Sequence, residues 1–541
     1  MPVCLYLDFN SEIGSCGKRI RFFDIILKIL PMYTLDSVAM WSVLVMFSAL
    51  LEIHYILATA RDGLISEDRN GDGGHSRSEE QSPDSAPSSA LAKITTADLN
   101  WNEPPFPCSE RCHCYASLKH GATMNCWHLD YDDLPPVIYR NLSRLRLDYN
   151  HITNLSRRGM DTARSVYQLS ISNNNITEMD ETAFADMTNL KELNLKFNPL
   201  MTLPDWVFSP LLRLTSFQLS NIGLQEFNSR AFVNLTNLVY LDLTDNVLKK
   251  MPRFVWNGAA LMPNLQYLHL EGNAIVSFHA SELRGYESVV ELHLTGNHIK
   301  TLEADNFFLM RSMNRLVLDK NFPFDDIDKC AFCQAARLQT ISLANSGFTV
   351  TRETASIFQR VPNIRKLSLS NIHISNKMKP DVDVVFQNLR RLMELDLTGV
   401  DLGSKIQSGM LANLTSLKWL RLSSTKIGTY LRGDVFVDVG DTLEQLDLAD
   451  NKLVTVNRSS LPEKLWRRLR RIDLSANPFT CDCNLVWFRR WLKTNSSILH
   501  IGALFLPTIT DHIVCRTTVF HFTHGVYVTW TIYLSISLFK N

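Results

Sequence analysis

One eleven-residue pattern, L-x-x-L-x-L-x-x-N-x-L, recurs fourteen times between Leu142 and Phe479, at intervals of about 24 residues. Repetition at a fixed period predicts a solenoid, in which each repeat buries its apolar side chains only against its neighbours. Leucines alternate with other residues inside the pattern, so we expect a short strand whose positions three, five and seven face solvent. Numbered in chain order, the repeats begin at Leu142, Val166, Leu190, Leu214, Leu238, Leu265, Val289, Met313, Leu338, Ile364, Leu392, Leu417, Leu443 and Leu469.

The ninth position of the repeat is asparagine in nine of the fourteen copies, including Asn150, Asn174 and Asn297. A short amide at the end of a strand can satisfy backbone groups where the chain turns away. The fourth repeat has Ile222 at this position. Repeats nine to twelve have Ser346, Ile372, Val400 and Thr425. Because those four repeats also vary in length, up to 28 residues, we expect the solenoid to be less regular there.

The second half of each repeat should return along the back of the solenoid. Phenylalanines such as Phe184 and Phe232 recur there, and we expect them to form a buried spine in short helical or 3₁₀ turns. Cys330 and Cys333 also lie on the back, in the eighth repeat. Their C-x-x-C spacing occurs in redox sites, but no βαβ pattern surrounds them. A loop disulfide or a pair of semi-buried thiols is therefore the expected state.

Cysteine clusters flank the repeats on both sides. Cys108-x3-Cys112-x-Cys114-x11-Cys126 precedes them, and Cys481-Asp-Cys483 follows them within Asn477-Pro-Phe-Thr-Cys-Asp-Cys-Asn-Leu-Val-Trp. The C-x-C spacings without paired histidines argue against zinc binding. Both clusters resemble the terminal caps of extracellular leucine-rich repeat proteins, such as Slit-like guidance proteins, Toll-like receptors and neuronal adhesion molecules. The resemblance covers roughly residues 108–515.

The resemblance implies an α/β solenoid, a leucine-rich repeat horseshoe of about 14 repeats with a parallel concave β-sheet and disulfide-bonded caps. It places the N-terminal cap at 101–141, the repeats at 142–478 and the C-terminal cap at 479–516. It also implies the disulfides Cys108–Cys114, Cys112–Cys126 and Cys481–Cys515. The family's C-terminal cap has four cysteines, whereas here no cysteine after Cys515 is left to pair with Cys483. We therefore expect an incomplete C-terminal cap.

Composition and processing signals point to export. The 55 basic and 55 acidic residues balance, so bulk charge gives no indication of nucleic-acid binding. Cysteine caps are typical of an oxidising compartment. Seven N-x-S/T sequons agree with this: Asn141, Asn154, Asn175, Asn234, Asn413, Asn457 and Asn495. The spacing of Asn234 and Asn413 before the next repeat predicts glycans on the back, which would leave the concave face clear.

The two ends of the chain differ from the repeats. Residues 1–60 read as a signal peptide or signal anchor, with an apolar stretch at 43–51 and an A-x-A motif at 58–60. Residues 61–100 are rich in Ser, Gly, Asp and Pro, which predicts a disordered linker. Residues 517–541 form an atypical apolar tail, whose run at 526–539 is too short to span a bilayer unaided. The expected location is therefore secreted or on the extracellular side of the cell surface.

The chain lacks the motifs that mark common enzymes. The sequence has no P-loop, no G-x-S-x-G elbow, no H-E-x-x-H and no dinucleotide glycine fingerprint. We predict that the protein is not an enzyme and has no cofactor. Two histidines on an open face would make a weak metal site, so no metal site is predicted either.

The most promising surface lies on repeats five to seven. The outward positions there are Tyr240, Tyr267 and Glu291 at position three, Asp242, His269 and His293 at position five, and Thr244, Glu271 and Thr295 at position seven. Tyrosines with mixed charges are typical of binding surfaces, although a solvated sheet face is the alternative. The two histidines predict that binding here depends on pH.

A basic cluster lies near the C-terminal end of the repeats, with Trp466, Arg467, Arg468, Arg470 and Arg471 followed by Arg489, Arg490 and Lys493. It could bind a sulphated glycan or anionic lipid headgroups, or it could be a solvated rim partly neutralised by Glu463, Asp473 and Asp482. The chain is therefore predicted to be an extracellular binding module of a secreted, adhesion or receptor protein, which binds a protein partner through its concave face. The alternative is a matrix-organising protein that binds glycans through this basic rim.

Overall fold

The computed structural model describes residues 106, 108–117, 120–136, 138–321, 324–404, 406–479 and 487, together with the backbone of 513–523 and 526–536. All described residues lie within one unit of the chain, residues 94–541. The predicted signal segment and linker therefore lie outside the described residues, as do Cys481, Cys483, Asn495 and the basic residues at 489–493.

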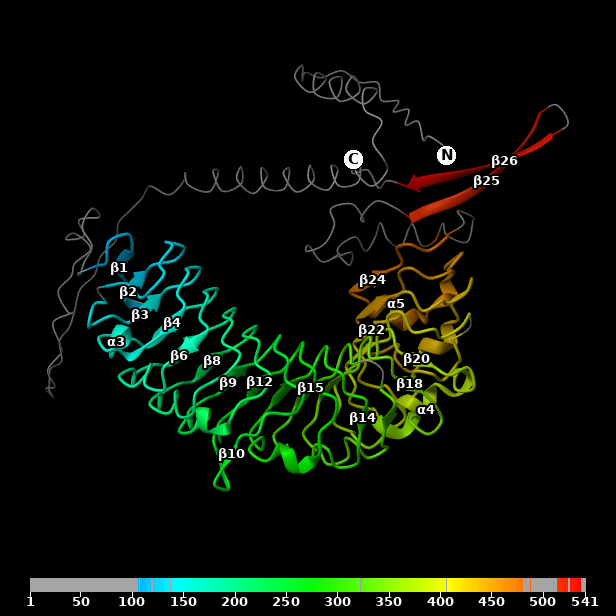
Figure 1. The fold of residues 1–541 in the computed structure, drawn as a ribbon. Coiled ribbons are helices and arrows are strands. Elements are labelled where there is room, and N and C mark those ends of the chain that lie inside the picture. Colours follow the sequence, from blue (N-terminus) through cyan, green and yellow to red (C-terminus); the bar gives the residue numbers. More distant parts are fainter. Residues whose placement is uncertain are drawn as a thin grey trace, which may run out of the picture. The chain divides into compact units, whose positions relative to one another are not determined.

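One continuous sheet of sixteen strands runs through the described repeats (Figure 1). Its order is β1-β2-β3-β5-β7-β8-β9-β12-β13-β15-β17-β19-β21-β22-β23-β24. Each of the fourteen repeats supplies one three-residue strand, and these strands pair in parallel with their central apolar residues in register, as Leu268 pairs with Leu241 on one side and Leu292 on the other. The predicted parallel solenoid is confirmed.

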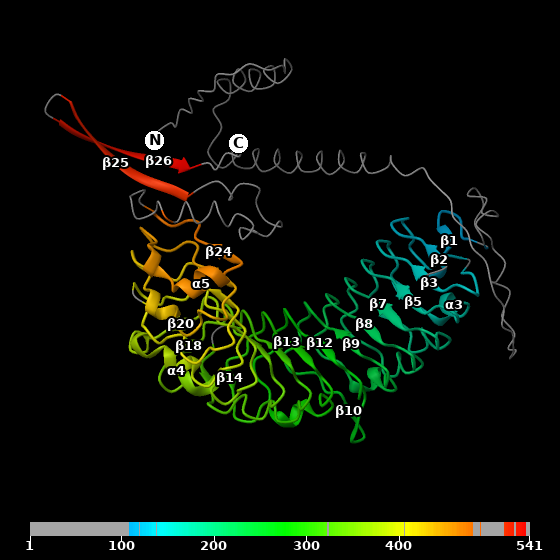
Figure 2. The ribbon, with the colours of Figure 1, turned by 180° about the vertical axis from the view of Figure 1, so that it is seen from behind.

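The strands of this sheet are β1 (His113–Ser117), β2 (Gly121–Asn125), β3 (Arg144–Arg146), β5 (Gln168–Ser170), β7 (Glu192–Asn194), β8 (Ser216–Gln218), β9 (Tyr240–Asp242), β12 (Tyr267–His269), β13 (Glu291–His293), β15 (Arg315–Val317), β17 (Thr340–Ser342), β19 (Lys366–Ser368), β21 (Glu394–Asp396), β22 (Trp419–Arg421), β23 (Gln445–Asp447) and β24 (Arg471–Asp473). Figures 1 and 2 show these strands on the inner side of the curve and the helical turns on its outer side.

Short helical turns cover the back of the solenoid. They are α3 (Arg157–Met160), η2 (Ser229–Phe232), η3 (Ala280–Leu283), η4 (Ala355–Phe358), η5 (Lys379–Asp381), α4 (Asp383–Phe386), η6 (Gly433–Phe436), η7 (Arg458–Ser460) and α5 (Glu463–Arg468). Phe232, Phe358, Phe386 and Phe436 lie in such turns and are completely buried or nearly so. The predicted phenylalanine spine is confirmed.

Four small two-stranded sheets lie among the described repeats, outside the main sheet. Three are parallel pairs between neighbouring turns: β4 (Asn154–Leu155) with β6 (Glu178–Met179), β14 (Thr301–Leu302) with β16 (Asp326–Ile327), and β18 (Thr349–Val350) with β20 (His373–Ile374). The fourth is the hairpin of β10 (Val255–Trp256) and β11 (Ala259–Ala260) in the fifth repeat. Its turn residues, Asn257 and Gly258, both have a positive φ.

The ninth-position asparagines connect successive turns. Asn297 is buried, and its Nδ2 donates to the carbonyl of Leu294 in its own repeat and to that of Leu270 in the preceding one, at 3.0 and 2.8 Å. Its Oδ1 accepts from the amide of Ile275 at 3.1 Å. The other members of this asparagine ladder repeat the arrangement: Asn150, Asn174, Asn198, Asn246, Asn273, Asn321, Asn451 and Asn477.

Repeats nine to twelve keep the sheet but lose the ladder. β17, β19, β21 and β22 pair in unbroken register, so the expected irregularity does not interrupt the sheet. Ser346 and Thr425 donate to carbonyls of their own repeats, at 2.6 and 2.7 Å, and the Thr425 hydroxyl also lies 3.1 Å from Oδ1 of Asn451 in the next repeat. Ile372 and Val400 carry no polar side-chain atom. On the back, η5 and α4 follow each other closely and lengthen the tenth repeat.

Both ends of the repeat stack are covered. At the N-terminal end, β1 and β2 form a hairpin whose second strand pairs in parallel with β3 and places Met124 against Leu145. At the other end, the Trp487 ring packs edge-on to Trp466 at 5.1 Å, and its Nε1 donates to the carbonyl of Val456 at 3.0 Å. These contacts bury the apolar ends that a solenoid would otherwise expose.

Beyond the repeats, β25 (Ile513–Thr523) and β26 (Val526–Ile536) form an antiparallel hairpin. The predicted boundary between cap and tail, at 516/517, falls inside β25. Within the described residues, no helix combines the length and the apolar character needed to cross a membrane.

Candidate functional site

The seven residues predicted to bind a ligand come together on three adjacent strands. Tyr240 pairs with Tyr267, which pairs with Glu291, and His269 lies between Asp242 and His293 in the same register. Glu271 lies two residues after the end of β12. We call these residues the concave patch: Tyr240, Asp242, Tyr267, His269, Glu271, Glu291 and His293.

The centre of the concave patch is a histidine–carboxylate cluster. The rings of His269 and His293 stack, with centroids 4.5 Å apart. The Nδ1 atoms of both rings approach the same carboxylate oxygen, Oε1 of Glu271, at 2.9 and 3.4 Å. The second oxygen of Glu271 accepts a hydrogen bond of 3.1 Å from the Thr244 hydroxyl. Both carboxylate oxygens of Glu271 are therefore engaged, one by the two histidines and the other by Thr244.

Two charged residues outside the predicted patch complete the network. The Nζ of Lys196, in the third repeat, contacts Oδ2 of buried Asp242 at 2.6 Å. The Nε of Arg315, in the eighth repeat, lies 3.9 Å from Oε2 of Glu291. Neither residue was predicted from the sequence. Lys196 is at position seven and Arg315 at position three of its repeat, and both positions face outward, so extending the search beyond repeats five to seven would have found them.

The network shifts the protonation of its members. Burial alone would lower the pKa of His269, but its hydrogen bond to Glu271 and the surrounding carboxylates outweigh burial and raise it. Burial and the neighbouring charge of His269 lower the pKa of His293. Burial, with Asp242 and Glu271 nearby, raises the pKa of Tyr240 to about 12, so its phenol stays a hydrogen-bond donor. The two histidines thus differ although they are equivalent in register.

The predicted covalent sites are placed as follows. Disulfides join Cys108 to Cys114 and Cys112 to Cys126, the two pairs that the cap resemblance implies. Cys330 is joined to Cys333, the first of the two predicted states. The Cys481–Cys515 pair lies outside the described side chains. Six sequon asparagines are exposed: Asn141, Asn154, Asn175, Asn234, Asn413 and Asn457.

The basic cluster near the C-terminal end is largely paired where the structure describes it. Arg467 contacts Glu463 at 2.6 Å, and Arg468 and Arg470 both contact Glu444, at 3.4 and 3.5 Å. Partial neutralisation was the alternative interpretation of this rim. Glu444, which supplies two of the three contacts, was not among the acids named from the sequence.

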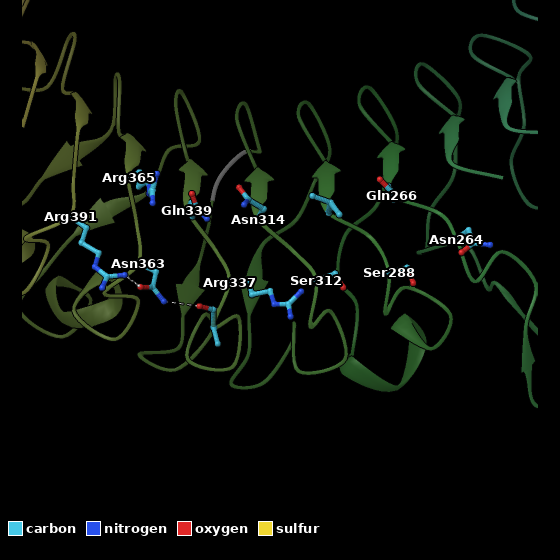
Figure 3. A pocket seen from close by; sticks show the side chains of 12 residues that line it. Asn264, Gln266, Ser288, Ser312, Asn314, Arg337, Gln339, Asn363, Arg365 and Arg391 are labelled. Atoms are coloured by element: carbon cyan, nitrogen blue, oxygen red, sulfur yellow. Dashed lines mark hydrogen bonds between the residues drawn. The ribbon is translucent and has the colours of Figure 1, made fainter. Parts of the chain in front are cut away.

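A different surface carries unneutralised arginines. A hollow of about 690 Å³ runs along the edge of the sheet where the strands begin, across repeats five to ten (Figure 3). Arg337, Arg365 and Arg391 line it, and none of the ion pairs in the described part of the chain involves them. Arg391 donates to the amide oxygen of Asn363 at 2.7 Å. We call this surface the lateral groove.

Comparison with known proteins places this geometry in a family. A leucine-rich repeat model matches residues 140–200, 188–248 and 212–275, and a BspA-type leucine-rich repeat region model matches residues 300–438. The chain belongs to the leucine-rich repeat proteins.

Individual relatives are distant. Mouse CD180 antigen is 26% identical over 265 residues, which cover 44% of this chain and 39% of the relative. Human Toll-like receptor 8 is 26% identical over 252 residues, covering 45% and 22%. A leucine-rich repeat protein of Leptospira interrogans shares the fold with a TM-score of 0.53 at 23% identity, over 68% of this chain and 93% of that chain. The chain spans well under half the length of both curated relatives.

Proposed function

We propose that this chain is the binding region of an extracellular receptor or adhesion protein, and that the concave patch holds a protein partner. The relatives support a receptor-type binding role, because a Toll-like receptor stands among them. The pattern of repeats supports it as well, since a solenoid offers one long surface and the enzyme motifs sought are absent from the sequence.

The observation that carries the proposal is the fixed, mixed chemistry of the concave patch. Tyr240 and Tyr267 lie side by side on paired strands, beside a network of ionic and hydrogen-bonded groups. Tyrosines lose little conformational entropy on binding and dominate many interface energies. Because Lys196 and Thr244 already hold Asp242 and Glu271 in place, a partner would meet a preorganised surface, which lowers the cost of binding.

The test compares binding of the full chain to cells that express its partner. Replacing both tyrosines, Tyr240→Ala with Tyr267→Ala, should weaken binding by more than about tenfold, because interface tyrosines commonly contribute about 2 kcal/mol or more. Tyr430→Ala is the matched control, since Tyr430 is 68% exposed and lies outside the concave patch. Equal binding by the parent and the double variant, or an equal loss in the control, contradicts the proposal.

A second candidate function is binding of a sulphated glycan, and the lateral groove favours it over the basic rim. The groove combines three arginines that lack acidic partners among the described residues with amide side chains such as Asn314 and Gln339. Guanidinium groups bind sulphates through paired hydrogen bonds.

Heparin retention separates the two surfaces. Arg337→Ala with Arg365→Ala should lower the salt concentration that elutes the full chain, whereas Arg467→Ala with Arg468→Ala should change it little, because these arginines are already paired. The reverse order would favour the rim, and no retention at physiological salt would remove glycan binding as a function.

A further inference from the structure

We infer that His269, Glu271 and His293 form a binding site for one zinc ion on the concave face. The sequence alone shows two histidines, and the structure adds a carboxylate to which both rings turn. The inference is independent of the proposed protein partner, because metal binding is measured on the chain alone.

The positions of the donor atoms fit one small cation. Nδ1 of His269 and Nδ1 of His293 lie 2.9 and 3.4 Å from Oε1 of Glu271. In a tetrahedral zinc site with bonds of about 2.0–2.1 Å, neighbouring donor atoms are about 3.3 Å apart. All three residues offer donor atoms within 4.8 Å of one another. Binding one ion would require the two rings to turn so that the distance between their donor nitrogens also matches the edge of a zinc tetrahedron.

The residues behind the three ligands hold them in the orientation that a metal requires. Thr244 donates to Oε2 of Glu271 and leaves Oε1 facing the histidines. Oε2 of Glu291 lies 3.5 Å from Nε2 of His293, the ring nitrogen that does not face Glu271. A carboxylate on the far nitrogen of a histidine is the usual support for a metal-binding imidazole, because it fixes the ring and makes it more basic.

Charge and burial also favour a cation of this kind. The side chains of His269, Glu271 and His293 are 24%, 23% and 17% exposed, so the ligands are partly desolvated yet still reachable from the concave face. Two imidazoles with one carboxylate suit zinc, whereas magnesium and calcium take oxygen ligands almost alone. The open fourth position would be filled by water or by a group of a bound molecule.

A second histidine–glutamate pair in the chain provides a control for the proposed site. His279 Nδ1 lies 3.0 Å from Oε2 of Glu303, much as His269 lies from Glu271. That pair is exposed, and it does not belong to a group of three potential ligands in the described part of the chain. His279→Ala thus removes a histidine–glutamate pair of similar geometry without touching the proposed site.

The experiment is zinc titration of the chelator-treated full chain by calorimetry. The parent should bind one equivalent more than the variant with His269→Ala and His293→Ala, and His279→Ala should bind like the parent. Glu271→Gln, which keeps the shape of the side chain, should weaken that equivalent by about tenfold or more. Zinc held by thiols elsewhere would persist in every variant and cancel in the comparison.

Cobalt spectroscopy tests the ligand set independently of stoichiometry. Cobalt at this site should show ligand-field bands that disappear in the double variant, without the thiolate charge-transfer band of a cysteine site. The inference is overturned if the parent, the double histidine variant and Glu271→Gln all bind zinc equally. It is also overturned if His279→Ala loses as much zinc as the double histidine variant. Thermal unfolding without zinc establishes that each variant is folded before titration.

Discussion

Replacing Asn297 with alanine tests whether the asparagine ladder stabilises the solenoid. Asn297 is 1% exposed and makes three hydrogen bonds to backbone groups of Leu270, Leu294 and Ile275. A hydrogen bond contributes about 1 kcal/mol net, and a buried group left without a partner costs about 1–3 kcal/mol. Because alanine would leave the Ile275 amide buried and unsatisfied, the free energy of unfolding should fall by about 3 kcal/mol.

Urea unfolding followed by circular dichroism measures this loss, and Asn264→Ala provides the matched control. Asn264 is exposed and donates one hydrogen bond of 2.9 Å to a backbone carbonyl of the preceding repeat. Its replacement should change the free energy of unfolding by no more than about 0.5 kcal/mol. Asn297→Ser should recover part of the loss, since Ser346 donates one such bond at the equivalent position. Equal losses for Asn297→Ala and Asn264→Ala would refute the reasoning.

Three further perturbations follow from the described contacts. Zinc affinity of the full chain should fall from pH 7.4 to 5.5 in calorimetry, because protons compete with zinc for the imidazoles of His269 and His293. The pKa of His269 is raised and that of His293 is lowered, so protons compete first at His269 as the pH falls. A constant affinity would contradict this prediction. The hydrogen bond from Lys426 lowers the pKa of Asp401 to about 2, so the stabilisation is present above the ordinary pKa of about 3.9 and is lost as pH falls through about 2. Asp401→Asn should therefore lower the free energy of unfolding by up to about 1 kcal/mol at pH 7 and progressively less in acid, because the pair is solvent-exposed. Phe232→Ala should cost about 3–5 kcal/mol in urea unfolding, since the ring is fully buried in the spine, and a loss below about 1 kcal/mol would argue against that spine.

Much of the fold could be predicted from the sequence because every copy of the repeat pattern forms the same short strand followed by the same turn. The alternation around Leu241 predicted both the strand and the outward direction of its neighbours, and repetition carried that register to every turn. The β10–β11 hairpin was missed, although Asn257-Gly258 is a recognised hairpin turn signal. This hairpin occurs within a single repeat, and a pattern shared by all repeats cannot predict a feature that only one of them has.

The concave patch was only partly predictable. Register alone placed Asp242, His269 and His293 in one row, because equivalent positions of a parallel solenoid must be neighbours. The convergence of both histidines on Glu271 depends on side-chain rotamers, which no repeat pattern specifies. Long side chains also cross repeats, so Lys196 reaches Asp242 from two turns away.

The absence of ladder asparagines from repeats nine to twelve predicts where neighbouring repeats separate first under force. At the four consecutive seams from the eighth repeat to the twelfth, no buried ninth-position amide crosses between turns. Backbone pairing, apolar contacts and more exposed side-chain pairs, such as Arg421 with Asp396, join these repeats. A force applied along the solenoid should open these seams first and divide the molecule into two mechanical blocks. The histidine–carboxylate cluster lies wholly in the N-terminal block, so it would stay assembled after the first rupture.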